Sequence, residues 1–589
     1  NIYSILLYKG VGMMWILGLL VFLPLLTAGL LFFIQGDRLR DAVVKVSAAA
    51  IAMLSLFVAF TYFGNKVVFR LGDSFLAQGA ILVDILVALA VFYYTCVRFH
   101  RYWIALLEAI QLGAVLWFEY VSHGTLDYYA DIIVDNFTLI MILIAGVIGS
   151  LIAVFSLGYM EAFQKEHRDV RDRRDFFFFV LFLFLSAMFG LVVSNNLLYM
   201  YTFWEITSVC SFLLIGYTES RVAVNNSFKA LWMNLLGGAA FAAAIIIMGL
   251  TYHSTALSHL VGLALAGMPV TVILALLLLC GFTKSAMMPF SGWLLGAMVA
   301  PTPTSALLHS STIVQAWVFR IGSYEAAWTA IMIVIFHAVA KSLLFLSVGT
   351  AEQQLGSRDI ERFDGLFNAM PHLCLCMVIG ISGMFLAPFG MLISKWAAMK
   401  AFIDAGHPML LLLLVFGSAT TIFYWAKWLG KILSVMNGQE RREQGITKGE
   451  WFTLKTLSWM TIIVCILFPL ISSYGVLPYL RITYGFTRDV IAQSNLIIMS
   501  LMVVLLVILP SRYGKGQPKR KVGALLAGVN TGDDRNYRGA GDNIIPVELR
   551  NWYMEEWFGE KKMKLSGFAL CMACIFIQFA IILGGVYRG

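Results

Sequence analysis

The stretch KSAMMPFSGWLLGAMVAPTPTSALLHSST, residues 284–312, sets a lysine, a histidine and three prolines inside an otherwise apolar chain. Of the 589 residues, 60% are hydrophobic and only 13% are charged, and the mean hydropathy is +0.83. Soluble domains carry about 25% charged residues, so most of this chain must face lipid or other helices. The composition predicts an all-α integral membrane protein, in which polar groups at membrane depth need a specific reason.

Apolar runs long enough to cross a bilayer recur along the chain. A bilayer core takes about 20 apolar residues per helix, and the sequence offers about sixteen such runs. They lie at 11–34, 43–63, 76–97, 103–120, 133–158, 175–194, 196–217, 227–251, 268–289, 301–321, 324–350, 371–393, 408–430, 453–474, 494–510 and 566–586. The first run is too long for a signal-peptide core and lacks a cleavage pattern, so we expect a retained span.

Basic residues gather in alternate connections between these runs. The richer loops include 165–174 and 515–521, whereas the opposite loops hold isolated residues such as Lys66 and Arg320. By the positive-inside rule the richer side is cytoplasmic, which places both termini outside a multi-pass protein of the cytoplasmic (inner) membrane. The basic residues behind the net charge of +9 therefore set the orientation of the protein in the membrane, and we expect no nucleic-acid partner.

One extended polar stretch, 511–565, precedes the last apolar run. Glycines interrupt its first part, which predicts an irregular cytoplasmic loop. Its last part, VELRNWYMEEWFGEKKMK (547–564), predicts an amphipathic interfacial helix, with Trp552 and Trp557 suited to the headgroup level. The same segment is alternatively a docking surface for a soluble partner.

Cysteines give no sign of a metal centre. All eight lie in apolar segments, and the pair Cys571 and Cys574 has no second pair to complete a four-ligand site. We interpret them as small buried hydrophobic residues. No glycine-rich nucleotide fingerprint occurs either, so we expect no cofactor, no metal and no redox catalytic site in this chain.

Six ionisable residues fall at predicted membrane depth: Glu205, Lys284, His309, His337, Lys341 and Lys395. A charge at the bilayer centre costs about 2.5–3.5 kcal/mol on insertion scales. Individually each could be a satisfied contact between helices; Lys395 could snorkel and His309 could be a packed core histidine. Together, acid, lysine and histidine groups in one chain favour a proton relay linked by water.

Two prolines lie beside two of these lysines. Pro289 follows Lys284 by five residues, and Pro388 precedes Lys395 by seven. Each breaks a helical hydrogen-bond ladder, one in each half of the chain, and such a pair points to an ion site between inverted repeats. Exposed carbonyls and water at a break can solvate a charge. A simple helix kink is the alternative interpretation of each proline.

Three segments that carry these residues resemble a known family. They are LLYMYTFWEITSVCSFLLIGY (197–217), TKSAMMPFSGWLLGAMVAPTPTSALLHSSTIVQAWVFRI (283–321) and FHAVAKSLLFLSVG (336–349). They closely resemble the antiporter-like subunits of respiratory complex I, especially the largest, distal one, and the large subunit of multisubunit Na+/H+ antiporters. The resemblance covers about residues 130–475.

The resemblance implies two inverted five-helix repeats, each with a discontinuous helix. It pairs Glu205 with Lys284 on the first broken helix, makes His309, His337 and Lys341 the bridging groups, and puts Lys395 on the second broken helix. The implied segments are 1–130 (N-terminal helices), 131–322 (first repeat), 323–476 (second repeat), 477–510 (an additional helix), 511–565 (the loop) and 566–589 (the last helix).

Two departures from the complex I pattern narrow the choice. No acidic pair follows Lys395 in ISKWAAMK (393–400), and FLAPFGMLISKWAA (385–398) is more similar to the corresponding subunit of Ech-type energy-converting [NiFe]-hydrogenases. The 55 or so residues before the last span would reach at most about 80 Å as a helix, and their glycines exclude a long lateral strut. Acidic residues of the complex I family near FKALWMNLLGG (228–238) also have no counterpart.

The resulting hypothesis is a subunit that moves H+, or exchanges H+ for Na+, in a redox-driven complex linked to ferredoxin. Its expected partners are other membrane subunits, hydrogenase and iron–sulfur subunits, and lipid. The alternatives are an antiporter subunit without a redox partner, a subunit of a complex I-like quinone oxidoreductase, a transporter of an organic solute, and a scaffold with idle buried charges.

Overall fold

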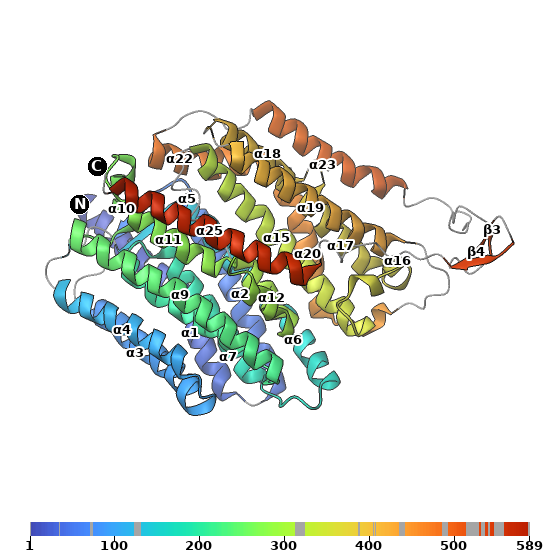
Figure 1. The fold of residues 1–589 in the computed structure, drawn as a ribbon, viewed down its shortest axis with the longest axis horizontal. Helices are drawn as coiled ribbons and strands as arrows, with labels where there is room; N and C mark the ends of the chain where they lie inside the picture. Colours follow the sequence, from blue (N-terminus) through green and yellow to red (C-terminus); the bar gives the residue numbers. More distant parts are fainter. Residues whose placement is uncertain are drawn as a thin grey trace.

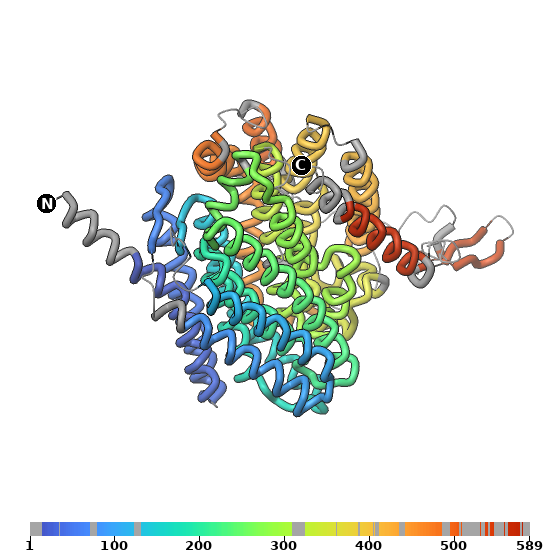
Figure 2. The backbone as a smooth tube through the Cα atoms, turned by 60° about the vertical axis from the view of Figure 1, so that its left-hand side comes forward, coloured from blue at the N-terminus to red at the C-terminus, as the bar shows by residue number. Residues whose placement is uncertain are grey.

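The computed structural model describes residues 2–34, 36–70, 75–122, 126, 131–311, 324–386, 389–404, 406, 408–434, 442–485, 493–513, 529–531, 536–539, 542–546 and 559–586. Within these ranges the chain forms a bundle of long helices (Figure 1), and a second view shows the same arrangement (Figure 2). The predicted all-α membrane fold is confirmed.

The α-helices are α1 (Ile2–Phe33), α2 (Asp37–Tyr62), α3 (Phe75–Phe92), α4 (Tyr102–Ser122), α5 (Asn136–Leu143), α6 (Gly149–Glu166), α7 (Arg174–Val193), α8 (Leu197–Ile215), α9 (Arg221–Tyr252), α10 (Leu257–Leu265), α11 (Thr271–Lys284), α12 (Gly292–Gly296), α13 (Thr302–Ser311), α15 (Tyr324–Leu355), α16 (Leu366–Ala369), α17 (Pro371–Phe385), α18 (Gly390–Asp404), α19 (Pro408–Leu433), α20 (Lys448–Ile466), α21 (Phe468–Leu470), α22 (Leu477–Tyr484), α23 (Gln493–Tyr513) and α25 (Glu560–Val586). The strands are β1 (Val67–Phe69), β2 (Ile132–Val134), β3 (Val529–Asn530), β4 (Asn536–Arg538) and β5 (Ile544–Pro546).

The number of spans differs from the predicted sixteen. In the described ranges, eleven helices are long and apolar enough to cross a membrane, or up to twelve if α20 and the bent segment after it are one span. The runs predicted at 268–289, 494–510 and 566–586 contain shorter apolar helices. The run at 301–321 begins as α13 and then passes into residues outside the described ranges. The total of sixteen is therefore not confirmed.

Two helices are interrupted where the sequence predicted breaks. α11 ends at Lys284, turns occupy 285–291, and α12 begins at Gly292, so Pro289 lies in the interruption. α17 and α18 are separated at 386–389, where Pro388 falls outside the described residues. The five-helix repeats and the segment boundaries stay predictions.

The polar stretch before the last helix differs from the predicted irregular loop. β3, β4 and β5 form a small antiparallel sheet, in which Asn530 pairs with Tyr537 and Tyr537 with Ile545. Strands of two or three residues have no alternating pattern long enough to be seen in the sequence. Most of the predicted interfacial helix (547–564) lies outside the described residues, and α25 begins at Glu560.

The bundle has two distinct edges. α3 and α4 form one edge, where α3 packs on α8 and α4 packs on α9, whereas α18, α19 and α23 lie at the opposite edge (Figure 1). Large apolar side chains such as Leu86 of α3 and Leu106 of α4 are exposed on the outer surface. Since exposed apolar side chains suit hydrocarbon, these faces fit contact with lipid.

Candidate functional site

The helices α8, α9 and α11 approach one another closely around Glu205 and Lys284. Two adjacent glycines of α9 permit this: a Cβ atom on Gly237 would lie 1.9 Å from Thr283 Oγ1, and one on Gly238 would lie 2.4 Å from Glu205 Oε1. Larger side chains at these positions would force the helices apart. The glycines therefore fix the distance between the predicted acid and the broken helix.

Lys284 ends α11 and points toward α8. Its Nζ donates a hydrogen bond to Ser208 Oγ at 2.9 Å, lies 3.5 Å from the carbonyl oxygen of Trp204, and sits 4.8 Å from the centre of the Trp204 ring. A hydroxyl, a carbonyl dipole and an aromatic face together stabilise an ammonium group. The site can therefore hold Lys284 in its charged form.

The pairing of Glu205 with Lys284 that the resemblance implies stays a prediction, and the structure shows how the two groups lie. Neither residue belongs to an ion pair within 4.0 Å among the described residues, although their charges lie close enough to interact. Lys284 instead reaches Ser208, which lies three residues after Glu205, about one turn further along α8. Glu205 and Ser208 thus share one face of α8, and Lys284 reaches that face from the end of α11.

Glu205 is 3% exposed and is held by residues from outside the predicted set. Its Oε1 accepts a hydrogen bond of 2.8 Å from Gln111 Nε2, which also donates to Tyr201 Oη at 2.6 Å. Within the described part of the chain its second oxygen, Oε2, is buried without a hydrogen-bond partner. A buried carboxylate oxygen left in this state is costly, and a proton or a water molecule would relieve that cost.

Sequence reasoning missed three further acids near Glu205. Asp84 of α3 accepts a hydrogen bond of 3.0 Å from Thr202, and Glu108 of α4 is buried; the charges of both interact with that of Glu205. Glu119 of α4 lies near enough to interact with Asp84. The signal was available, because acidic residues occur inside the runs 76–97 and 103–120.

The interruption after Lys284 is held by a side chain of the next segment. The indole Nε1 of Trp293 donates to the carbonyl oxygen of Thr283 at 2.7 Å, and Ser285 Oγ donates to Gly281 O at 2.7 Å. These bonds add side-chain donors to two carbonyl groups that also accept backbone N–H groups, from Ser285 at Gly281 and from Ala286 at Thr283. The helix break at Pro289 is therefore held in a defined conformation by hydrogen bonds next to Lys284.

The second half brings Lys341 and Lys395 together. α15 packs on α18, and the charges of the two lysines are close enough to interact. Lys341 Nζ lies 5.3 Å from the centre of the Trp425 ring and 5.8 Å from that of Phe345. His337 lies one turn before Lys341 on α15 and is partly buried.

The predicted bridge between the halves is described only in part. His309 belongs to α13, which packs on α15, but its side chain lies outside the described part of the structure. The structure therefore assembles two groups, Glu205 with Lys284 and Lys341 with Lys395. Their connection through His309 stays a prediction.

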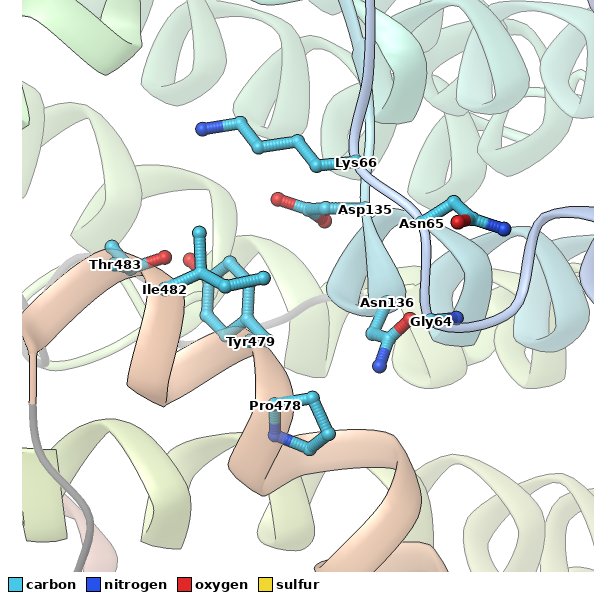
Figure 3. A pocket seen from close by; sticks show the side chains of 9 residues that line it. All are labelled: Gly64, Asn65, Lys66, Asp135, Asn136, Pro478, Tyr479, Ile482 and Thr483. Atoms are coloured by element: carbon cyan, nitrogen blue, oxygen red, sulfur yellow. Dashed lines mark hydrogen bonds between the residues drawn. The ribbon is translucent and has the colours of Figure 1, made fainter.

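A separate pocket lies at another surface of the bundle (Figure 3). It is lined by Gly64, Asn65, Lys66, Asp135, Asn136, Pro478, Tyr479, Ile482 and Thr483. Its polar groups have structural partners: Asp135 caps α5 through Thr138 N, and Asn136 Oδ1 accepts from Gly64 N at 2.9 Å. Burial raises the pKa of the Asp135 carboxyl, and the Thr138 hydrogen bonds oppose that shift. The pocket lies between the segment that follows α2 and the helix α22, and we assign no ion site to it.

The sequence matches two family descriptions. Residues 194–323 and 317–421 match "NADH:quinone oxidoreductase/Mrp antiporter, TM", and residues 117–169 match "NADH-Ubiquinone oxidoreductase (complex I), chain 5 N-terminus". The first match covers Glu205, Lys284, Lys341 and Lys395. The matched parts of the chain, residues 117–169 and 194–421, are therefore similar to antiporter-like membrane subunits.

Individual relatives agree with that assignment. Na(+)/H(+) antiporter subunit A1 of Staphylococcus haemolyticus (strain JCSC1435) is 27% identical over 385 residues, which make up 52% of this chain and 47% of that protein. Subunit A1 of Staphylococcus aureus (strain JH9) is 27% identical over 398 residues, with 53% and 49% covered. This antiporter-like chain therefore spans about half the length of the curated relatives it matches.

Solved structures support the same fold. A chain of the membrane-bound sulfane sulfur reductase (MBS), an archaeal respiratory membrane complex, superposes with a TM-score of 0.58 at 17% identity, covering 83% of this chain and 99% of that one. A chain of the Mrp complex from Dietzia sp. DQ12-45-1b gives a TM-score of 0.53 at 19% identity, covering 81% and 57%. At these identities the similarity shows a shared fold.

Proposed function

We propose that this antiporter-like subunit moves protons, or exchanges H+ for Na+, across the cytoplasmic membrane. The observation that carries the proposal is the buried Glu205 carboxylate beside Lys284, at a break in a membrane helix. Both side chains can gain or lose a proton, and each is placed where a change of protonation alters the other's electrostatic environment.

The charges suggest how a proton would pass. Charged Lys284 has Ser208 and Trp204 as its partners, and negative Glu205 stabilises it from a distance. A proton taken up by Glu205 removes that stabilisation, which favours release of a proton from Lys284 toward His309 and Lys341. Repulsion between Lys341 and Lys395 then favours onward release. Moving one charge against 100 mV costs about 2.3 kcal/mol, so an external reaction or gradient must drive the cycle.

The driving partner defines two candidate assemblies. In a redox-driven complex, soluble hydrogenase and iron–sulfur subunits would pass electrons from ferredoxin to protons. The shared fold with a chain of the sulfane sulfur reductase, a respiratory membrane complex, is compatible with a redox-driven assembly and is not specific to a hydrogenase. In a multisubunit Na+/H+ antiporter, an ion gradient alone would drive the exchange; the subunit A1 relatives favour that alternative equally. Copurification with metal analysis separates them, because only the first assembly brings nickel and iron–sulfur subunits.

The experiment that tests ion movement is Lys284→Ala in the whole complex. We expect proton uptake into inverted membrane vesicles to fall about a hundredfold, the range seen when a proton-transfer group is removed, while assembly is retained. Lys165→Ala is the matched control, because Lys165 makes an exposed i,i+4 pair with Glu161 away from the site. Unchanged proton translocation by the Lys284→Ala complex would refute the proposed function.

A further inference from the structure

The edge helices α3 and α4 carry acidic groups that the family matches do not cover. The matched residues are 117–169 and 194–421, so all of α3 and most of α4 lie outside them. Nevertheless both helices pack on the site, α3 on α8 and α4 on α9. Figure 1 shows them together at one edge of the bundle, beside α9. Polar groups that they carry inward need a reason of their own.

The inward groups are buried and incompletely satisfied. Asp84 is 7% exposed, Glu108 is 4% exposed and Gln111 is 2% exposed. Each has one oxygen (Asp84 Oδ1, Glu108 Oε2 and Gln111 Oε1) that is buried without a hydrogen-bond partner among the residues the structure describes. Buried polar atoms are nearly always paired, so these three oxygens point to protons or ordered water between the helices. The Gln111 amide shows that buried oxygens without a partner among the described residues are not confined to carboxylates.

The acids follow one face of α4 at helical spacing. Glu108, Gln111, Val115 and Glu119 recur every three or four residues, which places them on the same side of the helix. Glu108 and Glu119 are therefore about 16 Å apart along the axis. A single metal ion needs ligand oxygens within about 2.6 Å of itself, so Glu108 and Glu119 cannot share one ion. They form a file.

The interactions between neighbouring charges indicate the order of the groups along this file. Glu119 interacts with Asp84, Asp84 with Glu108 and Glu205, and Glu205 with Lys284. Glu119 lies three residues before α4 ends at Ser122 and is partly exposed, whereas Asp84, Glu108 and Glu205 are buried. Thr202 bridges toward Asp84 from one turn before Glu205 on α8. The sequence of groups thus leads from the membrane face at the C-terminal end of α4 to the centre of the site.

We propose that α3 and α4 carry a proton path of their own, which runs from Glu119 through Asp84 and Glu108 to Glu205. The inference rests on the proposed function of Glu205 and Lys284. It assigns to the edge helices the task of exchanging protons between Glu205 and the membrane face where α4 ends. That face is opposite the connection that carries Arg98 and Arg101.

Conservative variants of two path acids test this assignment. In vesicles that contain the whole complex, we expect Asp84→Asn and Glu119→Gln each to lower the rate of proton translocation about tenfold, because each removes one relay group. Glu161→Gln serves as the control, since this exposed acid pairs with Lys165 outside the file. Glu119 lies at the edge of the bundle, so we expect Glu119→Gln to assemble even if Asp84→Asn does not. The proposal can then be tested with Glu119→Gln alone. Wild-type rates in both variants would overturn the proposal.

Labelling identifies the ion independently of turnover. A hydrophobic carbodiimide modifies protonated carboxyl groups in membranes, and we expect modification of Asp84 or Glu108, located by mass spectrometry, that Na+ does not reduce. Protection of both residues by Na+ would overturn the proton assignment. If Lys284→Ala stops translocation while Asp84→Asn and Glu119→Gln do not, only the path is refuted. If Lys284→Ala also leaves translocation intact, the proposed function itself fails.

Discussion

The two halves of the bundle solve the burial of charge differently. Around Lys284, the first half supplies a hydroxyl, a carbonyl and the nearby acid Glu205. Around Lys341, the second half supplies the rings of Trp425 and Phe345 and a second positive charge, Lys395. Both environments place aromatic rings against the ammonium group, but a neighbouring carboxylate favours positive charge in the first and a neighbouring lysine disfavours it in the second. A proton that travels from Lys284 to Lys395 moves from a retaining site to a releasing site.

Glu205→Gln is the change that should break this contrast most completely. It removes the negative charge that distinguishes the first half while keeping the shape and the Gln111 contact. We expect translocation, followed by quenching of a pH-sensitive dye in vesicles, to fall about a hundredfold. Glu161→Gln is the matched control, because Glu161 forms an exposed pair with Lys165. Wild-type quenching would mean that the charge is idle.

Lys395→Ala tests the releasing half. Loss of one lysine relieves the repulsion on Lys341, so we expect Lys341 to retain its proton and the translocation rate to fall about tenfold. Membrane insertion and copurification of partner subunits should be unchanged. A silent phenotype here and in Glu205→Gln would favour the scaffold alternative.

Gly238→Ala sharpens the comparison through packing. The added Cβ would lie 2.4 Å from Glu205 Oε1, so the carboxylate or α9 must shift. Overpacking of this kind costs about 1–3 kcal/mol, measured as a lowered Tm of the complex in detergent, and translocation should fall with it. Gly417→Ala is the matched control in α19, because a Cβ there meets nothing within 4 Å. Equal stability of the two variants would contradict the close approach of α8 and α9.

Lys400→Gln should have the smallest effect. Lys400 pairs with Glu325 at 2.7 Å and with Asp404 at 2.5 Å, but its side chain is 46% exposed. The pair with exposed Asp404 contributes about 0–1 kcal/mol, whereas buried Glu325 loses its cation, so Tm should fall while translocation remains at the wild-type rate. A large loss of translocation would place Lys400 in the ion path and extend the second half beyond Lys395.

The sequence predicted well what depends on composition and local pattern. Long apolar runs identify spans because lipid cannot satisfy a backbone, and charges inside such runs, such as Glu205 and Lys284, stand out. It predicted poorly what depends on which helices meet. The acids of α4 are visible in the sequence, but nothing local reveals that Glu108 lies close enough to interact with Glu205.

The partner of Lys284 was also beyond the sequence. Opposite charges at matching depths predict an ion pair, whereas the structure places the ammonium on Ser208, about one turn from the acid. Side-chain direction at a helix end depends on the backbone of the break, and that backbone follows from tertiary contacts such as Trp293 with Thr283. Residue type indicated the chemistry, and packing decided the pairing.

The tie between Trp293 and Thr283 has a consequence for speed. Thr283 directly precedes Lys284, so twisting the end of α11 to aim the amine elsewhere would stretch the indole bond. With its base anchored, Lys284 changes partner by rotating its four flexible side-chain torsions. Such rotations are fast compared with collective helix motions, which take microseconds to milliseconds. The Lys284 side chain then rotates on a fixed backbone, and we expect its rotation not to limit the rate of the cycle. The rate is set instead by the arrival of water and ions and by the external driving reaction.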